Sequence, residues 1–178
     1  PLAAFHGGPL FLSANPTLLT DLKQSAGPSR PEMLRFDPAH PKAAPQVVLP
    51  AWEGTPPFCE HSYRSLAADG VGRELILLQN IGYAHAEWSF LDRDGKWSAQ
   101  GKLVWPMGNE YEKPEPVRLC YPAVALQDRA VHFLGVSDIV EPNLQWRTFK
   151  KELTGQNWDY DFRRLFYTCS KDVSSGRF

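Results

Sequence analysis

Residues 60–105 contain four short runs of strand-forming residues, separated by polar or glycine-containing turns. The runs read EHSYRSLAAD, RELILLQNI, AEWSFLDR and KWSAQGKLVW. Because glycine adopts positive φ without steric cost, the Asp94-Gly95 pair between two such runs is a strong hairpin signal. The chain also contains 16 Pro and 13 Gly, which suit short strands and turns rather than long helices. These features predict a four-stranded antiparallel unit.

A second unit of the same kind follows, and a partial one precedes. The later runs read VRLCYPAVALQD, AVHFLGVSD, LQWRTFKKEL and DFRRLFYTCS, and corresponding runs of the two units begin about 60 residues apart. Near the start, PEMLRFDP and PQVVLPAW read as two strands, and residues 16–24 as a helical turn or loop. Repeated units of this size are typical of β-propeller blades.

We therefore expect an all-β chain of about three blades, at residues 1–57, 58–116 and 117–178, the first of them irregular. Three blades do not close a ring, for which at least four are typical. The chain is expected to belong to a larger propeller, or to pair with a second copy. A β-sandwich is the alternative architecture.

Composition excludes several classes of partner. The formal net charge is −1, so nothing indicates a basic surface for nucleic acid or an anionic membrane. No apolar run reaches the roughly 18 residues that a transmembrane helix needs. The three cysteines form no CxxC pair, which argues against zinc, and we expect no metal or cofactor. Calcium is compatible with propellers, but no EF-hand-like run indicates it.

Two segments resemble a known structural turn. LDRDGKW resembles a loosened Asp-box, the turn of sialidase-like propellers, and SKDVSSGRF resembles a longer variant. With the strands around them, residues 58–178 resemble the BNR-repeat-containing proteins, including the propeller-type polysaccharide lyases that cleave ulvan. The resemblance implies a sialidase-like propeller that acts on carbohydrate outside the cytoplasm, in an extracellular or periplasmic location.

The resemblance also implies a set of site residues. In those lyases the site contains a His on the first strand of a blade, a second His at the end of the next strand, and the Tyr of a Tyr-Pro pair. In this sequence they match His61, His85 and Tyr121. These are the implied catalytic residues. The implied substrate-binding residues are Arg64, Tyr83 and Arg147. The Arg that the family places after the second strand of the Tyr blade is absent here, where that strand ends in GVSD.

These residue types suit β-elimination on an acidic polysaccharide. The reaction needs a base, an acid for the leaving oxygen, and a cation for the sugar carboxylate, which His, Tyr and Arg supply. Structural roles remain open for each of them: a backbone-bonded His61, an inert His85 and a packing Tyr121. His132 alternates with apolar residues and is expected in the core or between blades.

Two other functions stay open. Hydrolysis would need two carboxylates that face one sugar, and no spacing selects a pair. The candidates are Glu60, Asp69, Glu87, Asp138 and Glu141. The other alternative is a non-catalytic propeller that binds glycans or proteins, or a fragment without activity of its own.

Overall fold

The computed structural model describes residues 1–16, 30–53, 63–81, 84–108, 114–140, 143–155 and 160–178. These residues form antiparallel β-sheets with one short 3-10 turn and an α-helix between two strands, so the all-β prediction is confirmed. Within the described residues, no helix combines the length and apolar character needed to cross a membrane.

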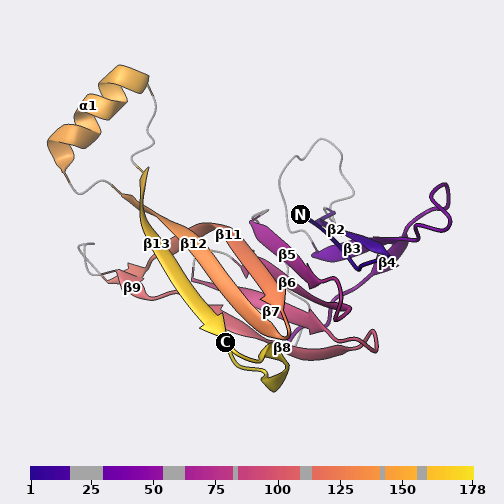
Figure 1. Ribbon diagram of the computed structural model, residues 1–178. Coiled ribbons are helices and arrows are strands. Elements are labelled where there is room, and N and C mark those ends of the chain that lie inside the picture. The colour runs from indigo at the N-terminus through magenta and orange to yellow at the C-terminus, as the bar shows by residue number, and fades with distance from the viewer. Residues whose placement is uncertain (17–29, 54–62, 82–83, 109–113, 141–142, 156–159) are drawn as a thin grey trace.

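The chain forms three main sheets in sequence order (Figure 1). The first sheet contains β1 (Leu2–Ala4), β2 (Leu10–Ala14), β3 (Glu32–Phe36) and β4 (Gln46–Val48). The second sheet contains β5 (Arg64–Asp69), β6 (Glu74–Ile81), β7 (His85–Leu91) and β8 (Trp97–Val104). The third sheet contains β11 (Arg118–Gln127), β12 (Ala130–Val140) and β13 (Tyr160–Ser170). A small ribbon of β9 (Met107–Gly108) and β10 (Glu115–Pro116) connects the second and third sheets.

The hairpin predicted at Asp94-Gly95 is confirmed as the turn between β7 and β8. Gly95 has φ +75°, and the Asp92 carboxylate accepts hydrogen bonds from the backbone N–H of Asp94 at 3.0 Å and Lys96 at 2.9 Å. An Asp that accepts from the following backbone groups stabilises a tight turn without help from elsewhere. The local sequence therefore sets the register of this hairpin.

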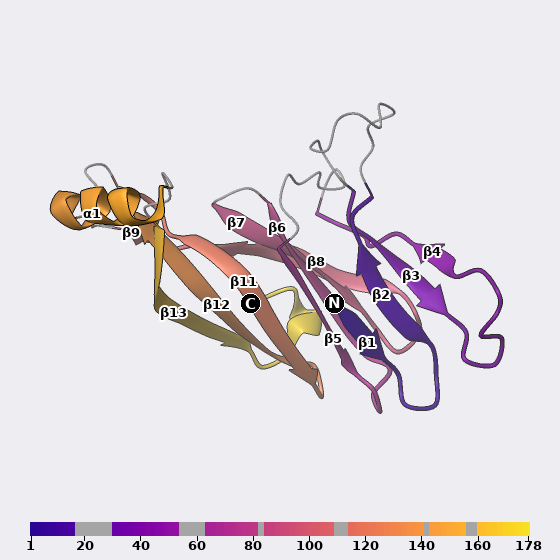
Figure 2. The ribbon, with the colours of Figure 1, turned by 90° about the horizontal axis from the view of Figure 1, so that it is seen from above.

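The second sheet lies between the other two, as Figure 2 shows from above. Because side chains alternate along each strand, one of its faces carries Leu66, Leu75 and Leu77 into a core shared with the first sheet. The other face carries Ile76, Leu78, Trp88 and Phe90 into a core shared with the third sheet. The first strands of the three sheets are also neighbours, because β5 contacts both β1 and β11. The second sheet thus buries apolar side chains on both faces.

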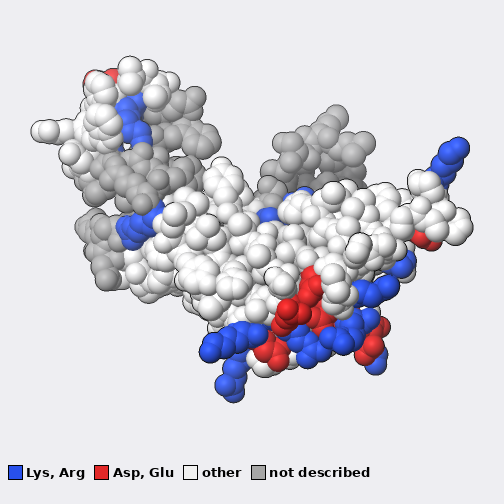
Figure 3. All heavy atoms as spheres, viewed as in Figure 1, with Lys and Arg blue, Asp and Glu red and all other residues white. Residues whose placement is uncertain are grey.

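One end of the stack, which we call the turn end, joins the second and third sheets through carboxylates at the β5–β6 turn. Asp69 accepts a hydrogen bond from the Asp128 backbone N–H at 2.8 Å, in the β11–β12 turn. Buried Glu74 lies 3.1 Å from the Arg129 guanidinium and 3.7 Å from that of Arg93. On the face seen in Figure 3, Lys, Arg, Asp and Glu side chains gather along this edge.

Two sequence expectations are wrong. Residues 144–153 were expected as a strand, but they lie in α1 (Leu144–Thr154), because Asn143 caps the helix and accepts from the N–H groups of Gln145 and Trp146. The core position expected for His132 is wrong, because alternation with buried Val131 and Phe133 places it on the exposed face of β12, whereas the alternative position between blades stays a prediction.

The first sheet has more strands than the sequence indicated. The predicted pair is confirmed as β3 and β4, whereas β1 and β2 were not expected. Of the segment 16–24, expected as a helical turn or loop, only residue 16 lies inside the described residues.

Candidate functional site

Tyr121 occupies a strained position near the start of β11. Its φ is +48°, a left-handed value that few residues other than glycine adopt, and the register with β12 shifts between Cys120 and Ala123. Pro122 follows and has no N–H to donate, which explains the bulge at this point. The side chain is 58% exposed, and its ring meets that of Tyr63 edge to face with centroids 5.2 Å apart. Backbone strain of this kind gathers at functional sites.

Arg64 lies beside the two tyrosines at the start of β5. Its Nε donates to the Ser13 hydroxyl at 2.9 Å and its Nη2 to the Ser13 carbonyl oxygen at 3.3 Å, so the first sheet orients the guanidinium. Arg64, Tyr63, Tyr121 and Pro122 line an open depression of about 390 Å³. The predicted residues Arg64 and Tyr121 are therefore brought together.

A row of polar residues crosses the second sheet from Arg64. Arg64 pairs with Gln79, Gln79 with Glu87, and Glu87 with Lys102, so the four lie on one face of neighbouring strands. Fully buried Gln79 accepts from Asn15 Nδ2 at 3.0 Å and donates to the Tyr63 carbonyl at 3.2 Å. Neutral amide contacts thus fix the strand ends behind the depression.

Buried Asn80 makes the matching contact on the opposite face of the second sheet. Its Nδ2 donates to the Leu119 carbonyl at 2.6 Å, which fixes the start of β11 and with it the position of Tyr121. The two amides at positions 79 and 80 therefore join the second sheet to both of its neighbours at this end.

His85 lies at the same end of the sheet, but in a different cluster. Its Nε2 is 3.6 Å from Glu87 Oε1, which is also 3.9 Å from Lys102 Nζ. The other Glu87 oxygen is buried and accepts no hydrogen bond from the described residues. Because β6 separates β7 from β5, His85 stands two strand spacings, or about 10 Å, from the strand of Arg64. His85 does not line the depression that holds Tyr121.

The remaining predicted residues lie elsewhere. His61 and Tyr83 fall outside the described residues. Arg147 lies on α1, which projects from the sheets in Figure 1 and has no buried residue. The structure adds Tyr63 to the depression, and no periodic signal in the sequence indicates it. It places Glu87, a candidate carboxylate from the sequence, beside His85, as expected for residues two apart on one strand face.

The depression combines aromatic faces, a phenol and an oriented cation. Aromatic side chains give large, amphipathic contact area, and guanidinium groups bind carboxylates through paired hydrogen bonds. Such a surface suits an anionic ligand with apolar faces. The described residues contain no cluster of three or more His, Cys, Asp or Glu side chains placed to hold a metal ion.

Comparison with known proteins adds no assignment. No protein-family model matches the chain, and no curated protein sequence matches it significantly.

Proposed function

We propose that the three sheets are successive blades of a sialidase-like β-propeller, which acts on an acidic polysaccharide by β-elimination. The order of the sheets supports the propeller: each is an antiparallel meander, and β1, β5 and β11, their first strands, are neighbours. The exposed phenol of Tyr121, on a backbone with positive φ and in one depression with the oriented guanidinium of Arg64, carries the functional proposal.

Each group has a role in this chemistry. Arg64 pairs with the uronate carboxylate and stabilises the negative charge that builds there when the neighbouring carbon loses its proton. Tyr121 exchanges a proton with the sugar: as acid it protonates the leaving 4-oxygen while the C4–O bond breaks and a C4–C5 double bond forms. The resemblance implies His61 as base or acid, and with Tyr121 as the acid, His61 takes the proton as base. His85, with Glu87 and Lys102, is assigned to a more distant sugar residue.

The second candidate is a non-catalytic glycan-binding propeller. The depression is open and is lined by two tyrosines, which offer a stacking platform for a pyranose ring. A binder needs this platform and the Arg64 cation, but it does not need the phenol proton of Tyr121.

Ultraviolet absorbance of the unsaturated product distinguishes the two functions. The wild-type protein is incubated with uronate-containing polysaccharides, and the rate is compared with that of Tyr121→Phe, which keeps the ring and removes the hydroxyl. We expect a loss of about 100-fold or more, as removal of a proton-transfer group usually causes. The matched control is Tyr167→Phe, an exposed tyrosine on β13 outside the depression, which should keep the wild-type rate.

Binding of the same polysaccharides is measured in parallel by calorimetry. Binding that Arg64→Gln weakens, without product formation by the wild-type protein, would establish the binder. A Tyr121→Phe variant with full lyase activity would refute the assignment of Tyr121.

A further inference from the structure

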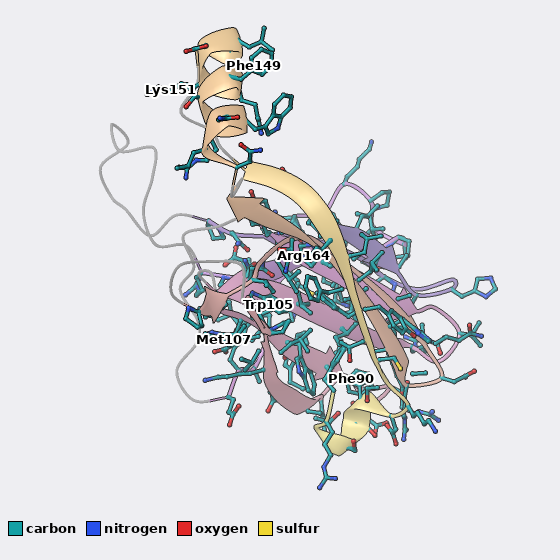
Figure 4. All side chains as sticks on the ribbon, turned by 90° about the vertical axis from the view of Figure 1, so that its left-hand side faces the viewer. Phe90, Trp105, Met107, Phe149, Lys151 and Arg164 are labelled. Carbon is teal, nitrogen blue, oxygen red and sulfur yellow. The ribbon has the colours of Figure 1, made fainter. Side chains whose placement is uncertain are left out.

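A cleft of about 380 Å³ opens between the first sheet and the β7–β8 hairpin, at the turn end of the stack. Part of its wall is apolar: Leu91 and half-buried Trp97 pair across the base of the hairpin, and Val48 of β4 lines the cleft with them. Figure 4 labels Phe90, which precedes this hairpin, and Met107, which follows β8 at the opposite end of the second sheet. The volume is within the range of small-molecule sites.

Three arginines from three segments also line the cleft, which are Arg35 on β3, Arg73 in the β5–β6 turn and Arg93 in the β7–β8 turn. Neighbouring side chains orient the first two. Arg35 Nη1 donates to Gln46 Oε1 at 3.4 Å, and the Arg73 guanidinium lies 5.9 Å from the centre of the Phe5 ring. Within the described part of the chain, neither Arg35 nor Arg73 forms an ion pair with a carboxylate.

The nearby carboxylates do not balance these cations. Arg93 Nε lies 3.7 Å from Glu74 Oε1, but Arg129 Nε lies closer to the same oxygen, at 3.1 Å. Asp92 and Asp94 line the cleft as well, and one Asp92 oxygen accepts two backbone N–H bonds within the hairpin turn. The lining therefore carries three guanidiniums and two carboxylates, with a net charge of +1.

Arg73 holds its place at a cost in backbone energy. Its φ is +58°, a left-handed value that glycine adopts without strain. Turn chemistry alone favours Gly or Asn at such a position. A strained residue persists where its side chain contributes something that the unstrained alternative lacks, and here the alternative lacks the guanidinium.

We propose that this cleft binds a small ligand in which an oxyanion, a carboxylate or a phosphate, is attached to a ring. Arg35 and Arg73 bind the oxyanion through charge-assisted hydrogen bonds, and Trp97 offers the ring an aromatic face. Arg64 begins β5 and Arg73 follows its end, so the cleft is separate from the Tyr121 depression. The proposal is therefore independent of lyase activity.

Calorimetry at low ionic strength tests the ligand class, because salt screens the cations. The probes are D-glucuronate and glucose 6-phosphate, and the comparisons are glucose, which lacks the anion, and inorganic phosphate, which lacks the ring. At least one probe should bind about tenfold more tightly than both comparisons, and the tighter probe identifies the anion. Arg64→Gln removes the cation of the Tyr121 depression, so this binding should persist in that variant.

Substitutions in the cleft test its residues. Arg35→Gln and Arg73→Gly should each weaken binding of the tighter probe by about tenfold or more, since each removes a charge-assisted contact. Gly accepts the φ of position 73, so the turn is kept. The matched control is Arg177→Gln, which removes an exposed guanidinium outside the cleft and should bind as wild type. Far-ultraviolet circular dichroism confirms that the variants are folded.

Phenylglyoxal, which modifies guanidinium groups, locates the bound anion. With the probe at about ten times its Kd, mass action predicts that Arg35 and Arg73 are modified roughly tenfold more slowly, whereas Arg177 is unaffected. Mass spectrometry of the peptides measures each rate. The proposal is overturned if neither probe binds, if inorganic phosphate or glucose binds as tightly, if both cleft variants bind as wild type, or if Arg177 is protected equally.

Discussion

Asp69 fastens the second sheet to the third, and its replacement by Asn tests how much that contact contributes to stability. The carboxylate accepts from the backbone N–H of Val71 at 3.1 Å and Gly72 at 2.7 Å, within its own turn. Its second oxygen accepts from the N–H of Asp128 at 2.8 Å. In Asp69→Asn the amide oxygen can still accept from Val71 and Gly72, but the NH₂ group then faces the Asp128 N–H. The inter-sheet hydrogen bond is lost.

The size of the effect follows from the charge on the acceptor. A hydrogen bond to a charged group contributes about 1.5–3 kcal/mol, and solvent beside this turn screens it toward the lower end. We expect Asp69→Asn to lower the free energy of unfolding by about 2 kcal/mol. For a domain of this size that is a decrease in Tm of about 4–8 °C.

The same contact makes stability depend on pH. The backbone hydrogen bonds from Gly72 and then Asp128 hold the pKa of Asp69 below its ordinary 3.8. A carboxyl group whose pKa is lowered by folding stabilises the folded state above the unfolded value, and that contribution disappears as the pH falls through the folded value. The Tm difference between wild type and Asp69→Asn should therefore be full near pH 7 and shrink below about pH 3.8.

Thermal unfolding followed by circular dichroism measures both effects. Asp37→Asn is the matched control, because hydrogen bonds from His40 and Ala39 also lower the Asp37 pKa, but within an exposed loop of the first sheet. This control should change Tm less than Asp69→Asn. Equal changes in the two variants, or a Tm difference for Asp69→Asn that persists unchanged at low pH, would refute the inter-sheet role.

Two further substitutions test the packing and the strain. A Cβ at Gly101 would lie 2.7 Å from Cζ2 of buried Trp88. Gly101→Ala should therefore lower the free energy of unfolding, measured by urea denaturation, by about 1–3 kcal/mol. An unchanged urea midpoint would show that the indole moves freely. At Tyr121, Gly accepts positive φ and Ala does not, so Tyr121→Gly should be more stable than Tyr121→Ala by about 1 kcal/mol; equal stabilities would contradict the strain.

The sequence predicts the strands best where a single local signal decides. In the second sheet, strand formers alternate with turn residues, and the four expected strands all form. The segment LQWRTFKKEL is ambiguous, because Leu144 and Trp146 fit a strand period, whereas Trp146, Phe149 and Leu153 fit a helix. The Asn143 cap and the left-handed Gly155 decide for the helix. His132 was misplaced because alternation gives the face of a residue but not whether that face is covered.

The site depends on contacts that no local pattern contains. Arg64 and Tyr121 lie far apart in the chain, and they meet because β5 and β11 are neighbouring first strands. The pairing of His85 with Glu87 follows from alternation within one strand, whereas its separation from Tyr121 depends on how the sheets stack. Sequence spacing therefore indicates the residue types of the site, but it does not determine which of them share one depression.

The two ends of the stack are held together by different contacts. At the turn end, Asp69 and Glu74 bind groups on neighbouring hairpins with charge-assisted contacts, which fix the second and third sheets together. At the other end, the neutral amides of Gln79 and Asn80, together with the Arg64 guanidinium, contact the neighbouring sheets. A left-handed Tyr costs about 1–3 kcal/mol and persists only where the surroundings enforce it. The contacts at the turn end and the strand pairing on both sides of the bulge hold β11 in place. They can therefore maintain the positive φ of Tyr121, at the point where a ligand would meet the phenol.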